Sequence, residues 1–530
     1  MPSLDWIGKK AVVAHHREVK CRLLRCDGAL SAGEPDTGNL LVQGDNLLAL
    51  KALLPHYAGQ VKCVYIDPPY NTGNENWIYN DAVNSPEMRA WLGKVVGGEA
   101  EDLSRHDKWL CMMYPRLVLL RKLLREDGSI WVTLDDTEAQ YLKIIMDEIC
   151  GRPNFLATVV WQKRTSPDAR VAFSDGHDTI FIYAKDINQL RNVINKTPKN
   201  ARQEKQYKNP DNDHRGPWTS SDYTAQGWRP NQMYKIKTPG GKIYTPPQGV
   251  CWKNVESVYL ELVRDKRIWF GKNGQGIPRR KTFLHESEGN VPWTWWPNEE
   301  TGHTQESKKE TKDLFGKDDV FETPKPERLI QRILQIATNP GDMVLDAFLG
   351  SGTTAAVAHK MGRRWVGVEM GDHAVTHCVP RLRKVVEGEQ GGISKAVGWS
   401  GGGGFRFCRL GPAITAPGGG IDPEVRFGDL AALAWFRATG EPLPKPPART
   451  APASPLLGVY RRTAIYLLYN GILKDKTPRG GNVLTRETLA LLPPHEGHKI
   501  VFATGCRLGA DRLARENISF RLIPFALTEK

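Results

Sequence analysis

Short apolar runs rich in β-branched residues recur along the chain, and between them lie segments whose apolar residues have helical spacing. Strand character occurs at residues 40–42, 61–66, 129–134, 344–346 and 365–368. Helical spacing occurs at residues 47–54, 108–124, 141–149, 329–336 and 355–361. Because strands and helices alternate, the pattern predicts an α/β fold with a doubly wound, Rossmann-like sheet.

The pattern changes between residues 186 and 321, which are punctuated by proline and glycine and interleave basic side chains with aromatic rings. A second change comes at the glycine-rich residues 388–404, which are typical of a flexible joint. The predicted parts are an N-terminal extension (1–37), two halves of one α/β domain (38–185 and 322–387), an inserted domain (186–321), the joint (388–404) and a small C-terminal α/β domain (405–530).

The motif Asp67-Pro68-Pro69-Tyr70 follows the strand at residues 61–66, at the end where open α/β sheets bind ligands. It suits attack by the exocyclic amino nitrogen of a base, whose lone pair is delocalised into the ring. If the Asp67 carboxylate and the Pro68 carbonyl accept its hydrogens, the lone pair becomes localised. Two prolines of fixed φ hold that carbonyl in place, and Tyr70 offers a face for stacking. The alternative is an ordinary turn after a strand.

A second motif, Asp346-Ala347-Phe348-Leu349-Gly350-Ser351-Gly352-Thr353, ends one strand and leads into a helix. Its glycines allow the backbone to approach a cofactor closely. Glu369 ends the next strand, where a carboxylate can accept hydrogen bonds from both hydroxyls of a ribose. Because Gly350-x-Gly352-x-x-Ala355 also fits the dinucleotide fingerprint, NAD-dependent oxidoreduction stays open on the glycines alone. The presence of the Asp67 to Tyr70 motif in the same chain favours a cofactor that serves attack by an amino nitrogen over NAD.

The chain carries a net charge of +14 over 530 residues, with a pI near 9.2. The excess is concentrated between residues 191 and 284, which hold 19 Lys or Arg against 7 Asp or Glu. Such a stretch is typical of a nucleic-acid-binding surface, although basic charge can also serve solubility alone.

Nine cysteines without paired spacing beyond Cys21-x4-Cys26 favour reduced thiols in a cytoplasmic protein and give no reason to predict a metal site. We expect no signal sequence and no membrane-spanning segment, because no basic start precedes an apolar core and apolar runs stay short.

The two motifs, in this order, resemble the permuted amino-group DNA methyltransferases that use S-adenosyl-L-methionine. Within that class the chain looks most like the modification subunits of type III restriction-modification systems. The closer likeness is carried by residues 41–46, 65–73, 269–272, 278–279, 295–297 and 323–327.

The resemblance implies N6-methylation of an adenine flipped out of double-stranded DNA, with residues 186–321 as the target-recognition domain. N4-cytosine methylation and a non-catalytic DNA-binding specificity subunit remain alternatives. It also implies a homodimer and a separate restriction or helicase subunit. Asn46 is the predicted N-cap of the helix at residues 47–54. The residue matching Asp45 lies beside the adenine of the cofactor in that family, and the alternative for Asp45 is a capping role.

The predicted catalytic residues are Asp67, Pro68, Pro69 and Tyr70. The predicted cofactor-binding residues are Asp45, Lys325, Asp346, Phe348, Gly350, Gly352, Thr353 and Glu369. The predicted DNA-binding residues are Trp228, Arg229, Lys272, Arg279, Arg280 and Lys281. Trp161 and Phe181 are alternatives for the wall behind the base.

Overall fold

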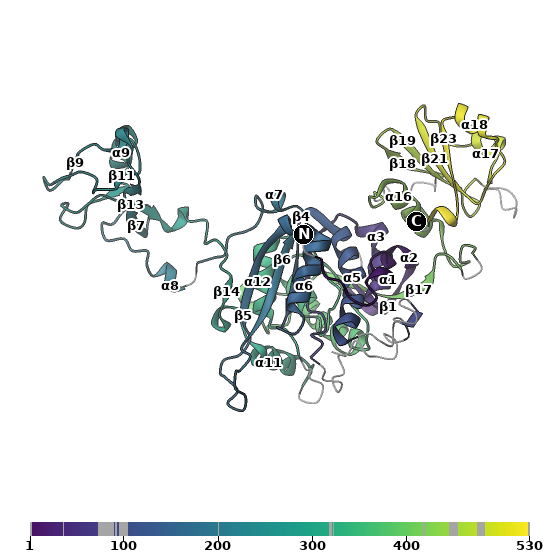
Figure 1. Ribbon diagram of the computed structural model, residues 1–530, viewed down its shortest axis with the longest axis horizontal. Helices are drawn as coiled ribbons and strands as arrows, with labels where there is room; N and C mark the ends of the chain where they lie inside the picture. Colours follow the sequence, from purple (N-terminus) through teal and green to yellow (C-terminus); the bar gives the residue numbers. More distant parts are fainter. Residues whose placement is uncertain are drawn as a thin grey trace. The chain divides into compact units, whose positions relative to one another are not determined.

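The computed structural model describes residues 3–34, 37–72, 90, 93–94, 104–199, 201–316, 321, 323–416, 419–444, 454–473 and 483–527. The stretch at residues 71–107, expected from sequence to form a mobile loop over the substrate, lies largely outside the described residues. The chain forms two compact units, one of residues 1–195 with 293–530 and one of residues 196–292 (Figure 1).

The described part of the first unit is built on a sheet of ten strands. Their order across the sheet is β1 (Arg22–Gly33), β17 (Gly404–Ala413), β2 (Leu40–Gln43), β16 (Arg364–Glu369), β15 (Met343–Asp346), β3 (Val61–Ile66), β4 (Leu124–Leu134), β6 (His177–Ala184), β5 (Phe155–Gln162) and β14 (Trp295–Trp296). The block from β17 to β4 is parallel, whereas β1 and β6 run antiparallel to their neighbours. This arrangement confirms the predicted α/β class.

The strands that carry the two motifs are direct neighbours. Strand β15 pairs in parallel with β3, so that Leu345 lies opposite Val64. All six residues of β3 are buried, as expected for a central parallel strand covered on both faces. Because parallel strands end at the same edge of the sheet, this pairing brings Asp346 and Asp67 to one edge, although 279 residues separate the two motifs in the chain.

Helices cover both faces of the sheet and enclose two apolar clusters. On one face the core includes residues of α3 (Asn46–Tyr57), α5 (Arg105–Leu123) and α6 (Ala139–Met146). On the other face it includes α12 (Glu327–Ala337), α13 (Thr353–Lys360) and α14 (Val379–Val386). The predicted helices are all present, with bounds shifted by a few residues at their ends.

The N-cap of α3 is Asp45, one of the two roles considered for that residue, and not Asn46. Asp45 is the N-cap and accepts from the backbone N–H of Leu48 at 3.0 Å, and Asn46 is already helical. The Asn46 side chain donates instead to the Ala347 carbonyl at 2.9 Å. A carboxylate at this cap satisfies an orphan N–H and lies at the positive end of the helix dipole.

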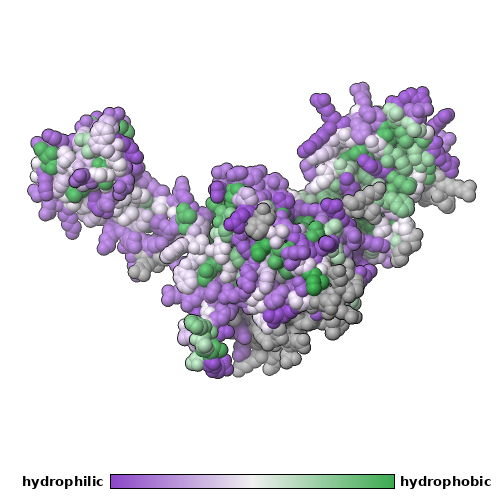
Figure 2. All heavy atoms as spheres, in the orientation of Figure 1, coloured by the Kyte–Doolittle hydropathy of each residue, from purple (hydrophilic) through white to green (hydrophobic). Residues whose placement is uncertain are grey.

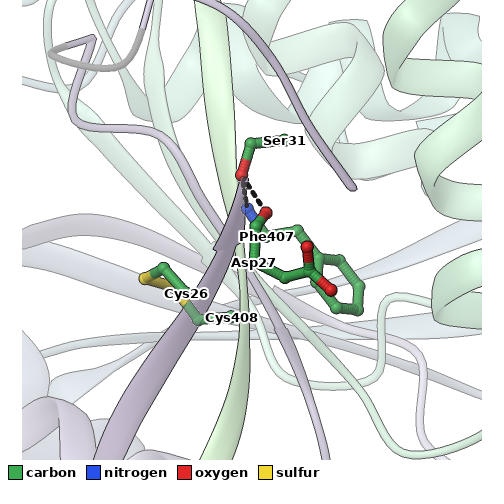
Figure 3. The surroundings of a disulfide bond; sticks show 5 residues. All are labelled: Cys26, Asp27, Ser31, Phe407 and Cys408. Atoms are coloured by element: carbon green, nitrogen blue, oxygen red, sulfur yellow. Dashed lines mark hydrogen bonds between the residues drawn. A yellow bond between two sulfur atoms is a disulfide. The ribbon is translucent and has the colours of Figure 1, made fainter. Parts of the chain in front are cut away.

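The N-terminal residues are part of the sheet. Val12 of α1 (Lys9–Val12) and Val19, which directly follows α2 (His15–Glu18), are buried in the first core cluster, and β1 pairs with β17. Cys26 and Cys408 face each other in this register and form a disulfide (Figure 3). The expectation that all the thiols are reduced is therefore wrong for this pair, whose partners lie 382 residues apart.

Residues 388–404 are packed against the domain rather than forming a free joint. Ile393 is buried in the second core cluster, and the Gly402 carbonyl lies 2.9 Å from His359 Nε2. A Cβ atom at Gly401 would come within 3.0 Å of the Gly388 nitrogen and the Val386 carbonyl. The glycines therefore permit close backbone approach here and do not mark a flexible linker.

The C-terminal part has its own sheet, with strand order β18 (Leu456–Tyr460), β19 (Thr463–Leu467), β21 (His498–Ala503) and β23 (Ile518–Leu522). Its helices are α16 (Phe427–Thr439), α17 (Arg486–Ala490) and α18 (Ala510–Arg515). Because β17 extends to Ala413 within the main sheet, this sheet and its helices begin later than residue 405. Among all described residues, no helix is long and apolar enough to cross a membrane.

The second unit, residues 196–292, is narrower than the predicted inserted domain. Its largest sheet has the order β12 (Ile268–Trp269), β13 (Arg279–Phe283) and β7 (Trp218–Asp222), and α9 (Glu256–Arg264) contributes to its core. Residues 293–315 belong to the first unit because Trp295 and Trp296 pair with β5 and thereby extend the main sheet.

Candidate active site

The loops that follow β3 and β15 border one cavity of about 630 Å³. The loop after β3 contributes Asp67, Pro68, Pro69 and Tyr70 to its wall, and the end of β15 with the loop after it contributes Asp346, Phe348, Gly350 and Thr353. Lys325 and Trp161 also contribute to its wall. Phe181 packs in the core on the opposite face of the sheet, so of the two alternatives for the wall only Trp161 reaches the cavity.

The Asp67 carboxylate is held by two neighbours. Its Oδ1 accepts from the Tyr70 hydroxyl at 3.0 Å, and its Oδ2 forms an ion pair with Lys325 Nζ. Lys325 also lies 5.1 Å above the centre of the Tyr70 ring. Lys325, predicted as a cofactor-binding residue, therefore contacts the catalytic motif itself.

Burial controls the ionisation of this motif. It raises the pKa of Asp67, and the positive charge of Lys325 opposes that rise. Burial also raises the pKa of Tyr70 well above its usual value, with the Asp178 and Asp67 carboxylates acting in the same direction. Tyr70 is therefore a neutral hydrogen-bond donor at physiological pH.

Two polar residues of this network were not predicted from sequence. The Tyr70 hydroxyl also lies 3.0 Å from Asp178 Oδ2, and Asp178 Oδ1 accepts from Lys163 Nζ at 2.7 Å. Asp178 is at the start of β6 and Lys163 directly follows β5. The two antiparallel strands bring them together, and no local motif marks either residue in the sequence.

The backbone of the motif is fixed by Trp109 of α5, whose indole Nε1 donates to the Pro69 carbonyl at 2.7 Å. Trp109 is fully buried, so this hydrogen bond is shielded from water. We expect Trp109→Phe, which keeps most of the packing but removes the donor, to slow turnover by about 2- to 10-fold, corresponding to about 0.5–1.5 kcal/mol. Steady-state kinetics would check this, with an unchanged dissociation constant for the cofactor as the control. Unchanged turnover would contradict the role assigned to this contact.

The turn after β15 has the geometry of a cofactor loop. Gly350 and Gly352 have φ of 57° and 83°, which lie in the left-handed region that favours glycine. Gly352 caps α13, so the first N–H groups of that helix are left for other acceptors. The buried Arg381 links this turn to α12, because it donates to Thr353 Oγ1 at 2.8 Å and to the Glu327 carboxylate at 2.8 Å.

Asp346 is a buried acid in the cavity wall. It accepts from the Thr354 hydroxyl at 2.6 Å and from the Phe348 N–H at 2.9 Å. Burial nevertheless raises its pKa to about 7, because the two hydrogen bonds only partly offset the loss of water. A cationic ligand in the cavity would favour its ionised form.

Three predicted cofactor residues are not part of the described cavity wall: Gly352, which caps α13, and two carboxylates that bind within the framework. The Glu369 carboxylate accepts from the backbone N–H of Gly350 at 2.8 Å and from that of Gly371 at 3.2 Å. Asp45 caps α3 and forms an ion pair with Arg116 at 2.9 Å. Their predicted contacts with ribose and adenine remain predictions.

The comparison with known protein families adds independent information. A family model described as DNA methylase, N6_N4_Mtase, matches residues 61–379. This chain belongs to that DNA methylase family. The match begins at β3 and ends at α14, so it includes both motifs and the unit between them.

Curated relatives of this methylase include the type III restriction-modification enzyme StyLTI Mod subunit of Salmonella typhimurium. It is 37% identical over 348 residues, in an alignment that covers 61% of this chain and 50% of that protein. The probable type III restriction-modification enzyme HindVI Mod subunit of Haemophilus influenzae is 31% identical over 435 residues, in an alignment that covers 71% of this chain and 54% of that protein. The chain thus spans about half the length of these relatives. A solved structure of PvuII DNA methyltransferase (cytosine-N4-specific) is similar over 65% of this chain and 86% of its own, with 14% identity and a TM-score of 0.35.

The second unit of the methylase carries the residues predicted to bind DNA, and four of the six have solvent-exposed side chains. Trp228 is 69% exposed, and Arg229, Lys272 and Arg280 are exposed. The half-buried Arg279 is paired with Asp222. Most of the other aromatic side chains of this unit are packed in its core, including Tyr223 and Trp252.

Lys281 does not suit a phosphate contact. It is 3% exposed and forms ion pairs with Asp211 and Asp213, the latter at 3.1 Å. It lies on the same side of β13 as the buried Phe283, because side chains two residues apart on a strand share a face. The prediction of Lys281 as a DNA-binding residue is therefore wrong.

The exposed Lys272 and the buried Lys281 should respond differently to substitution. We expect Lys281→Met to lower the free energy of unfolding by about 3 kcal/mol, because it leaves carboxylates without their buried partner. We expect Lys272→Ala to change stability by less than about 0.5 kcal/mol while reducing the salt dependence of DNA binding by about one phosphate contact. Denaturant unfolding and salt titrations of binding would check both. A reversal of the two results would contradict the assignment.

Proposed function

We propose that this chain is the methyltransferase part of a restriction-modification enzyme and transfers a methyl group from S-adenosyl-L-methionine to the N6 amino group of adenine in double-stranded DNA. The observation that supports this most strongly is the single cavity lined by both Tyr70 and Phe348. One wall is suited to an unstacked base and the other to a nucleoside cofactor. A base within a duplex must be flipped out to enter it.

The residues of the second wall fit S-adenosyl-L-methionine. Gly350 and Thr353 present backbone at the start of a helix, and Asp346 offers a carboxylate whose raised pKa would fall beside a cation. When bound, this cofactor supplies an electrophilic methyl group. Further proposed contacts to the cofactor come from Lys325, Asp45 and Glu369. Asp45 and Glu369 would reach the cofactor after small movements of the groups that they now bind.

The residues of the first wall would activate the amino group. Asp67 and the Pro68 carbonyl accept one N–H each, so the lone pair points towards the donor. Lys325 and Tyr70 each contact one oxygen of the Asp67 carboxylate, and a second lone pair on either oxygen could accept the N–H of the incoming amino group. Asp67 would accept the surplus N–H proton once the nitrogen lone pair has bonded to the methyl group that the cofactor would supply, with the electrons of the broken C–S bond left on sulfur. The raised pKa of Asp67 suits it to receive that proton.

Partners are proposed from the relatives. Those proteins are Mod subunits of type III enzymes, so we propose a homodimer that works with a separate restriction or helicase subunit. Residues 196–292 form the target-recognition domain in this proposal and Trp228, Arg229, Lys272 and Arg280 contact DNA. The C-terminal α/β domain is a candidate for the subunit interface.

Labelled methyl transfer tests the proposal. The full chain, alone and with a candidate partner subunit, is incubated with methyl-labelled S-adenosyl-L-methionine and unmodified genomic DNA. The DNA is then hydrolysed to nucleosides and separated. We expect the label in N6-methyl-2′-deoxyadenosine, and sequencing of the modified DNA would give the recognition site. Label in N4-methyl-2′-deoxycytidine would move the proposal to the other amino base, and no label would refute it.

A further inference from the structure

The loop that joins β5 to β6 projects from the sheet and is held by two hydrogen bonds between its two arms. Its neck is closed by the Lys163 N–H, which donates to the Gly176 carbonyl at 2.9 Å. Nearer the tip of the loop, the Asp168 N–H donates to the Ser174 hydroxyl at 2.8 Å. These two cross-links leave only residues 169–173 at the tip. The loop is therefore built to present a short tip in a defined place.

The tip is apolar and open to solvent. Phe173 is 96% exposed and Val171 is 52% exposed, and the neighbouring Ala169 and Ala172 are exposed as well. In Figure 1 the loop extends beyond β5 and β6 at the lower left, and Figure 2 shows hydrophobic surface at its end. A phenyl ring so fully hydrated gains nothing from burial in the fold, which suggests that it is buried against a ligand instead.

The base of the same loop lines the active-site cavity. Residues 164–168 are part of the wall that also contains Tyr70 and Trp161. From Asp168 to Phe173 the chain can span at most about 17 Å. The tip therefore extends from the rim of the pocket proposed to receive the flipped base, at a distance comparable to a few base-pair steps.

The charged side chains of the loop are arranged so that they do not screen this tip. Arg170 folds back onto Asp168, with a guanidinium-to-carboxylate distance of 2.7 Å, and Lys163 is paired with Asp175 at 2.7 Å. Arg170 is held against Asp168 although its side chain is 87% exposed, and the other four residues of the tip are apolar. Apolar side chains that enter a duplex between base pairs unstack them and fill the gap.

We propose that the tip of the β5–β6 loop is a DNA wedge, and that Phe173 enters the duplex and occupies the space left by the flipped adenine. This inference rests on the proposed function and adds to it the residue that keeps the base out of the stack. The ring makes no contact with the cofactor or the reacting atoms, so Phe173 is a positioning residue. Its contribution depends on whether the target base is paired.

The test uses duplexes that carry the recognition site with the target adenine either opposite thymine or opposite an abasic nucleotide. We expect Phe173→Ala to lower the single-turnover rate on the paired target by about tenfold or more, because flipping then lacks its substitute for the lost stacking. On the abasic duplex, where the target is already unpaired, we expect the variant and the native chain to react at similar rates. Phe173→Trp should retain most of the rate on the paired target.

Two controls separate the possible outcomes. Phe525→Ala removes another exposed ring, 67% exposed, from the C-terminal domain and should leave both rates unchanged. Native methylation of both duplexes shows that the proposed function stands, so equal rates for Phe173→Ala and the native chain on the paired target would overturn the wedge alone. An equal loss on both duplexes would also overturn it, because it would mark a general structural role. If Phe173→Ala methylates normally but loses binding of a partner subunit, the tip is a protein interface and the wedge is refuted.

Discussion

Replacement of Asp67 by alanine is expected to abolish methyl transfer, with a rate loss of at least about 1000-fold. The carboxylate is the charged acceptor in the motif and the proposed destination of the surplus proton. Asp67 is also the ion-pair partner of Lys325, so its removal changes both the geometry and the charge of the pocket. Binding of S-adenosyl-L-methionine should change by only a few-fold, because the cofactor is expected to contact the opposite wall.

Two variants make this result specific. Asp67→Asn keeps the shape and one acceptor oxygen but not the charge, and we expect a rate between those of the native chain and Asp67→Ala. Asp136→Ala removes an exposed carboxylate just beyond the end of the neighbouring β4 and should leave the rate unchanged. Single-turnover rates and calorimetric cofactor titrations would be measured for each. If Asp67→Ala lost cofactor binding and turnover together, Asp67 would be structural.

Asp346→Asn is expected to remove most of the pH dependence of cofactor binding. In the ligand-free protein burial raises the pKa of this carboxyl to about 7, against about 4 in an unfolded chain. It therefore binds a proton between about pH 4 and 7 that the unfolded chain has lost, so its contribution to stability falls as the pH rises through this window. A bound cationic cofactor would instead favour the ionised form of Asp346. Affinity should rise as the pH increases through 7, with release of a proton.

Calorimetry at pH 6 and pH 8, in buffers of different ionisation enthalpy, measures both the cofactor affinity and the number of protons released on binding. At pH 8 we expect Asp346→Asn to bind about 10- to 100-fold more weakly, the value of a hydrogen bond or contact with a charged group. Glu310→Gln is the matched control, because burial and the charge of Glu327 also raise the pKa of Glu310 to about 7 but it is not part of the described cavity wall. Equal native affinity at both pH values would contradict the role of Asp346.

Local sequence patterns predicted the framework of the site well. The strand that precedes Asp67 and the strand that ends at Asp346 are both mainly apolar. The rule that ligands bind at C-terminal strand ends placed their loops together. The structure confirms this, since β3 and β15 are neighbours and both loops line one cavity. The motif residues could be found because each motif is contiguous in the chain.

Features that depend on tertiary pairing could not be predicted. Asp178 and Lys163 meet Tyr70 only because β5 and β6 pair, and Cys26 meets Cys408 only because an N-terminal strand without clear periodicity joins the sheet. Lys281 was assigned to DNA from its charge alone. Its spacing from Phe283 is the one signal that could have shown it to point inward, and that signal is weak in a five-residue strand.

We propose that the loops after β3 and β15 hold a methyl donor and an unstacked adenine in one cavity. The most direct test is a crystal structure of the chain with a duplex containing its recognition site and an unreactive analogue of S-adenosyl-L-methionine. We expect the target adenine outside the helix, stacked at Tyr70, with its N6 about 3–3.5 Å from the analogue atom that replaces the methyl carbon. An adenine still stacked in the duplex, or an analogue bound away from Phe348, would contradict the claim.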